Sequence, residues 1–183
     1  EMPAERICFG KALNAGQSCV APDYVLCPEH RVDEFIREFS AALQRMYPDM
    51  LRNDDYTSVV NDRQWERLQG YLEEAREGGA EIIVLNPDGE PGLPGSRRMP
   101  IHLVRGARPE MRLMREEIFG PILPVLAVED LDEAIRSEAI GLNADRGSSW
   151  ISSPSAAASR SGSAVRSPSI NATSRWSERT ATS

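Results

Sequence analysis

The chain has 183 residues, of which 40% are hydrophobic, and a formal net charge of -7. This length suits one globular domain, and the acidic balance lacks the electrostatic footprint of a general nucleic-acid-binding protein. No apolar run approaches the roughly 18 to 20 residues that span a bilayer, and the N-terminus resembles no signal peptide, so we expect a cytoplasmic protein without a membrane segment.

Residues 1–136 alternate extended and helical patterns, which predicts an α/β fold with a parallel-type sheet and flanking helices. Two helices are predicted, because large apolar residues recur at steps of three and four. Short Ile- and Val-rich runs predict buried strands. In chain order the elements are a strand over Tyr24–Cys27, a helix over Arg31–Met46, a helix from the N-cap Asn61 to Gly78 and Gly79, and strands over Ile82–Leu85, Ile101–Val104 and Ile122–Val128.

Residues 137–183 form a second region with a different composition. Ser, Arg, Ala and Thr dominate from about Gly147, and no helical or strand periodicity is present. Such a segment cannot bury enough apolar surface to offset the entropy of ordering its backbone. We therefore expect a disordered low-complexity tail, and we interpret the sequence after about Arg136 as an out-of-frame reading of its gene. A phosphorylatable, RNA-associated tail is the alternative.

Three cysteines, Cys8, Cys19 and Cys27, fit no zinc-binding spacing, so we expect no metal and reduced thiols. Cys8 and Cys27 lie in apolar stretches, where packing is the expected role. Cys19 follows Gly16, Gln17 and Ser18 in a polar turn, which is a better setting for a reactive thiol.

Two motifs, NAGQSC at residues 14–19 and EEIFGP at residues 116–121, lie about a hundred residues apart. In this order and at this spacing they resemble the catalytic-cysteine and EIFGP motifs of the NAD(P)-dependent aldehyde dehydrogenases. The flanking stretches GKALNAGQSCVAPDYVLCP, DYTSVVNDRQWERLQGYLEEA and MREEIFGPILPV are similar to the coniferyl-aldehyde dehydrogenase branch. The resemblance covers residues 1–136 and implies a partial catalytic domain of that family.

The resemblance implies that Cys19 is the nucleophile that attacks an aldehyde, aromatic or of medium chain length, to form a thiohemiacetal and then a thioester. Physically, a thiolate suits an aldehyde carbon, and the backbone N–H of Cys19 could stabilise the oxyanion. The alternatives are a small buried thiol, or a Cys-His hydrolase site with His30 or His102, although neither histidine forms a recognisable pattern with Cys19.

In the second motif the resemblance implies that Glu117 accepts hydrogen bonds from a ribose of NAD or NADP and that Phe119 packs near the nicotinamide. A carboxylate suits this task because its two oxygens can meet two adjacent hydroxyls. Glu116 is assigned to the scaffold or to solvent. The alternative for Glu117 and Phe119 is a helix-end charge and a core aromatic.

The family's dinucleotide-binding unit, oxyanion-hole Asn and water-activating Glu are expected upstream of the cysteine motif, and this chain begins eighteen residues before Cys19. The prolines of the Gly-Pro stretch at residues 89–95 favour a surface turn, so we expect no phosphate loop there. We therefore expect the isolated chain to be inactive and to bind NAD weakly. Full-length relatives are implied to be homo-oligomers. The competing hypothesis is a noncatalytic remnant or interaction module that keeps only part of the fold.

Overall fold

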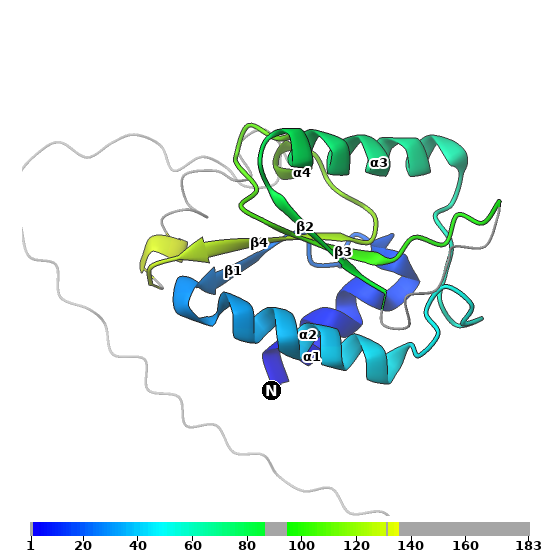
Figure 1. The fold of residues 1–183 in the computed structure, drawn as a ribbon, viewed down its shortest axis with the longest axis horizontal. Coiled ribbons are helices and arrows are strands. Elements are labelled where there is room, and N and C mark those ends of the chain that lie inside the picture. The colour runs from blue at the N-terminus through cyan, green and yellow to red at the C-terminus, as the bar shows by residue number, and fades with distance from the viewer. Residues whose placement is uncertain (1, 87–94, 131, 136–183) are drawn as a thin grey trace, which may run out of the picture. The chain divides into compact units, whose positions relative to one another are not determined.

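Figure 1 shows the computed structural model of the chain, which describes residues 2–86, 95–130 and 132–135. The tail predicted over residues 137–183 and most of the Gly-Pro turn lie outside these residues. The elements are α1 (Met2–Ala12), the 3-10 turn η1 (Leu13–Gly16), β1 (Val25–Pro28), the 3-10 turn η2 (Glu29–Arg31), α2 (Val32–Met46), α3 (Asp62–Glu77), β2 (Glu81–Leu85), β3 (Ile101–Arg105), α4 (Arg112–Arg115) and β4 (Ile122–Val128).

The four strands form one sheet in the order β1-β4-β3-β2. Strand β4 lies inside the sheet and runs parallel to both neighbours, so that Val25 pairs with Val125 and Leu103 pairs with Leu123. The four predicted strands and the α/β class are therefore confirmed. Strand β1 follows the first motif and β4 follows the second. Because β1 and β4 pair in parallel, the two motifs lie at the same edge of the sheet.

Strand β2 departs from a purely parallel sheet, because it runs antiparallel to β3, with Ile83 paired with Leu103. The apolar runs of both strands carry no signal of direction, since a buried strand looks the same in either orientation. The expectation of a parallel sheet is thus correct for β1, β4 and β3 and wrong for the edge strand β2.

The two predicted helices are present as α2 and α3. In α2 the large apolar residues form one buried face, to which Phe39 and Leu43 contribute fully buried side chains. In α3 the side chain of Asn61 caps the first turn, because its Oδ1 accepts a hydrogen bond of 2.9 Å from the N–H of Gln64. The chain leaves the end of this helix through Gly79, whose φ is +84°.

Helix α1 is an addition to the predicted elements. It buries Ala4, Cys8 and Ala12, which recur every fourth residue. These small side chains give a much weaker apolar signal than Leu or Phe would, which is why the sequence pattern did not reveal the helix.

The helices cover both faces of the sheet, with α1 and α2 on one side and α3 on the other (Figure 1). Alternate residues of the central strands point to the two faces, as the pleat of a β-strand requires. Leu103 and Val125 belong to the core under α1 and α2, whereas Val104 and Ile122 belong to the core under α3.

Candidate active site

The first motif begins with a left-handed turn. Asn14, Ala15 and Gly16 have φ values of 52°, 52° and 71°, all in the left-handed region. Such a conformation costs roughly 1 to 2 kcal/mol for a residue that has a side chain. Hydrogen bonds oppose this strain: Asn14 Nδ2 donates to the carbonyl of Gln17 at 2.9 Å, and the N–H of Gln17 donates to the carbonyl of Asn14 at 3.1 Å.

Gln17 joins this turn to the chain before α3. Its side chain is 8% exposed. Its Nε2 donates to the carbonyls of Asn14 at 3.1 Å and Ser58 at 3.0 Å, while its Oε1 accepts from the N–H of Val60 at 2.9 Å. Both ends of the amide are therefore engaged, and Gln17 fixes the loop from which the next residues project.

Cys19 lies beyond this fixed point and is exposed, whereas Cys8 and Cys27 are buried. The N–H of Ala21 donates to the carbonyl of Ser18 at 3.1 Å, which closes a tight turn around Cys19. The packing predicted for Cys8 and Cys27 is confirmed. The alternative of a buried thiol is wrong for Cys19, because the loop that holds it is anchored through Gln17 rather than through the cysteine.

The cysteine loop contacts the second motif directly, backbone to backbone. A Cβ atom built on Gly16 would lie 2.4 Å from the carbonyl oxygen of Gly120, a distance that no real side chain could occupy. A second link is the N–H of Ile118, which donates to Oδ1 of Asp23 at 3.3 Å. The structure thus brings together the two motifs that the sequence singled out.

Residues 116–121 of the second motif join α4 to β4. Glu117 is exposed, and its carboxylate makes no hydrogen bond or ion pair with the described part of the chain. Phe119 is 39% exposed and has a φ of 45°. Glu116 serves the scaffold, since its Oε2 accepts a hydrogen bond of 2.6 Å from the hydroxyl of Tyr71. Because the Phe119 side chain is exposed, the alternative interpretation of this residue as a core aromatic is wrong.

Arg67 of α3 holds the backbone of the second motif through hydrogen bonds. Its Nη2 donates to the carbonyl of Ile118 at 2.6 Å, and its Nη1 donates to the carbonyl of Glu117 at 3.1 Å. Sequence reasoning did not identify this residue, because a lone arginine on an amphipathic helix usually belongs to its solvated face.

Lys11 of α1 is the second residue that the sequence did not reveal. Its side chain is fully buried, and its Nζ has no hydrogen-bond acceptor among the described residues. Its Cδ would lie 3.3 Å from a Cβ built on Gly16, which places the lysine stem beneath the cysteine loop. Burial lowers the pKa of Lys11 to about 8, although the charge of Asp23 opposes this change.

The two histidines have no part in this arrangement. His102 lies in β3, and its Nδ1 is 2.8 Å from the carbonyl oxygen of Pro100. Burial lowers the pKa of His102. His30 is exposed in η2, on the chain between β1 and α2. Nothing in these positions supports a Cys-His pair with Cys19.

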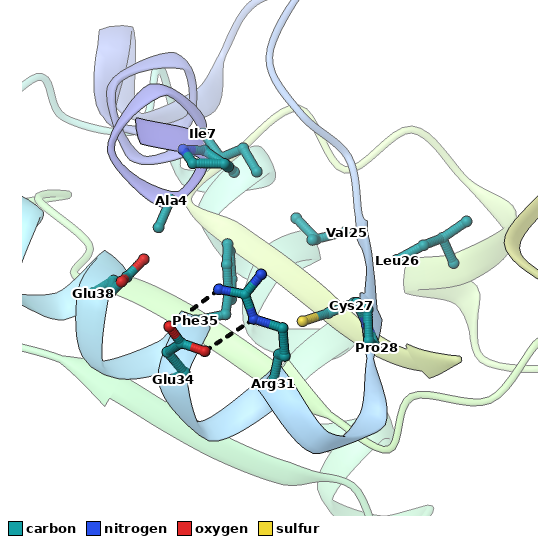
Figure 2. A pocket seen from close by; sticks show the side chains of 11 residues that line it. Ala4, Ile7, Val25, Leu26, Cys27, Pro28, Arg31, Glu34, Phe35 and Glu38 are labelled. Carbon is teal, nitrogen blue, oxygen red and sulfur yellow. Dashed lines mark hydrogen bonds and ion pairs between the residues drawn. The ribbon is translucent and has the colours of Figure 1, made fainter. Parts of the chain in front are cut away.

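A groove elsewhere on the molecule contains none of the three predicted site residues. Figure 2 shows that side chains of α1, β1 and α2 line it, including Ile7, Cys27 and Phe35, and that the Arg31–Glu34 ion pair also lines it. Burial raises the pKa of the Cys27 thiol in this groove.

The described residues contain no cluster of His, Cys, Asp and Glu suited to a metal ion. None of their helices is long and apolar enough to cross a membrane.

We expect Cys19 to react first when the folded chain meets a limiting amount of iodoacetamide. Burial raises the pKa of the Cys8 thiol to about 12, so Cys8 is both shielded and protonated. Peptide mapping after short exposure measures the order of labelling, and the same reaction in denaturant is the control, because it should label all three thiols at similar rates. Earlier labelling of Cys8 or Cys27 in the folded chain would contradict this expectation.

A family model described as "Aldehyde dehydrogenase family" matches residues 1–144. The probable coniferyl aldehyde dehydrogenase of Pseudomonas aeruginosa is 48% identical over 132 residues, and the match covers 72% of this chain and 27% of that protein. This chain therefore spans about a quarter of the length of that relative.

Solved structures show the same relationship. The substrate-bound state of Staphylococcus aureus AldH superposes with a TM-score of 0.64 at 38% identity, over 73% of this chain and 28% of that one. An NAD-dependent benzaldehyde dehydrogenase from Corynebacterium glutamicum superposes with a TM-score of 0.58 at 27% identity, over 73% of this chain and 28% of that one.

Proposed function

Because this chain belongs to the aldehyde dehydrogenase family, we propose that it carries the cysteine-bearing part of a site that oxidises an aldehyde to a carboxylic acid with NAD or NADP. The observation that carries the proposal is the exposed Cys19 on a strained loop, fixed against the segment that bears Glu117 and Phe119. The substrate we propose is an aromatic aldehyde such as coniferyl aldehyde, or one of medium chain length. The name of the Pseudomonas relative, a probable coniferyl aldehyde dehydrogenase, supports the aromatic substrate.

In this proposal the Cys19 thiolate attacks the carbonyl carbon, a C–S bond forms, and the former carbonyl oxygen becomes an oxyanion. In the same proposal the backbone N–H of Cys19 donates a hydrogen bond to that oxyanion and stabilises its charge. Departure of a hydride from the same carbon restores its C=O bond as a thioester. Water then adds to the thioester, the C–S bond breaks and the carboxylic acid leaves, while one proton passes to solvent and Cys19 returns to its thiolate form.

A bound nicotinamide cofactor supplies the acceptor for that hydride. The described residues fit such a group at two points. The Glu117 carboxylate is exposed and makes no hydrogen bond or ion pair with the residues that the structure describes, so we propose that its two oxygens meet two ribose hydroxyls. The ring of Phe119 is partly exposed two residues farther along and offers an apolar surface.

The proposal is tested by placing residues 1–135 of this chain in the matching stretch of the Pseudomonas aeruginosa relative. We expect the hybrid to form NADH from coniferyl aldehyde and NAD. The hybrid with Cys19→Ser should lose at least about a thousandfold in rate, because the nucleophile is removed. The hybrid with Cys27→Ser is the matched control and should stay active.

Three results would contradict the proposal or separate it from its rival. A hybrid that folds, by circular dichroism and size-exclusion chromatography, yet forms no NADH would favour the noncatalytic remnant. Activity that survives Cys19→Ser would remove Cys19 from the role of nucleophile. Equal loss in Cys19→Ser and Cys27→Ser would show that general damage to the domain, rather than chemistry, explains the effect.

A further inference from the structure

We propose that Arg67 positions Glu117 and Phe119 for the ribose and nicotinamide of the cofactor. This inference rests on the proposed function, since it assigns a supporting residue to the same site. Arg67 lies in α3, whereas Glu117 and Phe119 lie between α4 and β4, so the contact joins two separate parts of the chain.

The guanidinium of Arg67 holds two successive carbonyl oxygens. Nη2 is 2.6 Å from the oxygen of Ile118, and Nη1 is 3.1 Å from the oxygen of Glu117. These two peptide groups belong to Glu117 itself and to the residue that precedes Phe119. Two N–H groups of one planar cation therefore fix the backbone at the point from which both proposed cofactor contacts project.

The segment needs such support because it lies outside regular structure and includes an unfavourable conformation. Phe119 has a φ of 45°, which is uncommon for a bulky residue. Helix α4 ends at Arg115 and strand β4 begins at Ile122, so Glu117 and Phe119 lie between these two elements and belong to neither. A strained conformation persists only where the surroundings hold it, and Arg67 provides part of that hold.

Arg67 is itself held on two sides. Its Nε donates to Oε1 of Gln64 at 2.6 Å, and its Nη1 donates to the hydroxyl of Tyr71 at 2.6 Å. The guanidinium carbon lies 5.0 Å from the centre of the Tyr71 ring. The Tyr71 side chain is buried, and its hydroxyl in turn donates to Glu116. The guanidinium thus has a fixed orientation before any cofactor arrives.

Lysine cannot replace this arrangement, although it keeps the charge. An ammonium is a compact donor at the end of a flexible stem, whereas the guanidinium presents its N–H groups in a planar fork. The variant Arg67→Lys therefore removes the paired contact to the two carbonyls while it leaves the net charge unchanged. The matched control is Arg63→Lys, an exposed position on the same helix.

The test uses the whole chain and nicotinamide mononucleotide, the half of the cofactor that Glu117 and Phe119 would meet. Saturation-transfer NMR measures its binding, and hydrogen exchange measures protection of the amides between residues 116 and 122. In Arg67→Lys we expect these amides to exchange about tenfold faster, the change that corresponds to losing one hydrogen bond. We also expect the nucleotide signal to be lost, while Arg63→Lys keeps both properties.

A variant with reduced stability separates positioning from folding. Leu72→Val changes a buried residue of α3 that is 3% exposed, and it lowers stability while Arg67 is kept. Loss of the nucleotide signal in Leu72→Val as well would reduce Arg67 to a structural role and overturn the inference. A nucleotide signal that survives in Arg67→Lys would also overturn it.

The design distinguishes failure of this inference from failure of the proposed function. If the unmodified chain gives no nucleotide signal, the assignment of Glu117 and Phe119 to the cofactor fails, and hydrogen exchange alone decides the role of Arg67. Unchanged exchange in Arg67→Lys then means that Arg67 does not position the segment. Faster exchange confined to the amides of the second motif supports it.

Discussion

The substitution Gly16→Ala is expected to lower the free energy of unfolding by about 2 to 5 kcal/mol. Two costs combine at this position. The φ of +71° disfavours any side chain by roughly 1 to 2 kcal/mol. The new methyl group would also lie 2.4 Å from the Gly120 carbonyl oxygen, and forcing an extra carbon into a packed interior typically costs about 1 to 3 kcal/mol more.

Urea unfolding of the two proteins measures this difference, and Gly106→Ala is the matched control. Gly106 has a φ of +75°, but a Cβ built on it would have no neighbour within 4 Å. The control therefore reports the backbone cost alone, at roughly 1 to 2 kcal/mol. Equal destabilisation by the two substitutions would mean that the contact between Gly16 and Gly120 is not tight in solution. We also expect Gly16→Ala to change the alkylation rate of Cys19, because the loop must move to relieve the overlap.

The substitution Lys11→Met is expected to have the opposite effect and to raise the free energy of unfolding by about 3 kcal/mol at pH 7. Lys11 has a buried ammonium with no acceptor among the described residues. Its pKa falls from an ordinary 10.5 to about 8 in the folded chain. At about 1.4 kcal/mol for each tenfold change in proton affinity, this lowering corresponds to about 3 kcal/mol. Methionine has a similar length and carries no charge to bury.

The gain from Lys11→Met should depend on pH in a defined direction. Below pH 8 the lysine is charged in both states, so the folded protein bears the whole penalty. As the pH rises from about 8 to 10.5, the folded lysine loses its proton before the unfolded one does, and the unmodified protein gains stability. The advantage of methionine therefore shrinks over this interval.

Unfolding measured from pH 7 to pH 10.5 tests this pH dependence. Cys8, whose pKa rises to about 12, titrates in both proteins and cancels in their difference. The control Arg6→Met removes an exposed charge from the same helix and should change stability by no more than about 0.5 kcal/mol. A difference between Lys11→Met and the unmodified chain that stays constant with pH would show that Lys11 finds a partner in solution.

The sequence predicted those parts of the fold that large apolar side chains specify locally. Helix α2 was predictable because Phe39, Leu43 and their neighbours form a continuous apolar face. Helix α1 was not, because Ala4, Cys8 and Ala12 bury little area each, so α1 depends on packing against α2 that sequence periodicity does not show. The direction of β2 was undetermined for a similar reason, since strand pairing depends on distant residues.

In the candidate site, too, the sequence predicted the residues that belong to a recognisable pattern and missed those that only tertiary contacts reveal. Motif spacing led to Cys19, Glu117 and Phe119, and the structure places all three on exposed loops that meet through Gly16 and Gly120. Their chemical roles remain proposals. The sequence around Arg67 and Lys11 gives no indication of where their cationic side chains lie. A charged residue looks alike in sequence whether it is solvated, held against carbonyl groups or buried, and only tertiary contacts distinguish these cases.

The position of β4 has a consequence for synthesis on the ribosome. Strand β4 is the last strand of the described chain, yet it lies inside the sheet and pairs with both β1 and β3. Among the described strands, β1 therefore has no neighbour until residues 122–128 emerge, and before that point only β2 and β3 can pair. The nascent chain must therefore expose the apolar face of α2 while about 80 further residues are added, and that of α3 while about 50 are added. Such exposed surfaces invite aggregation or chaperone binding.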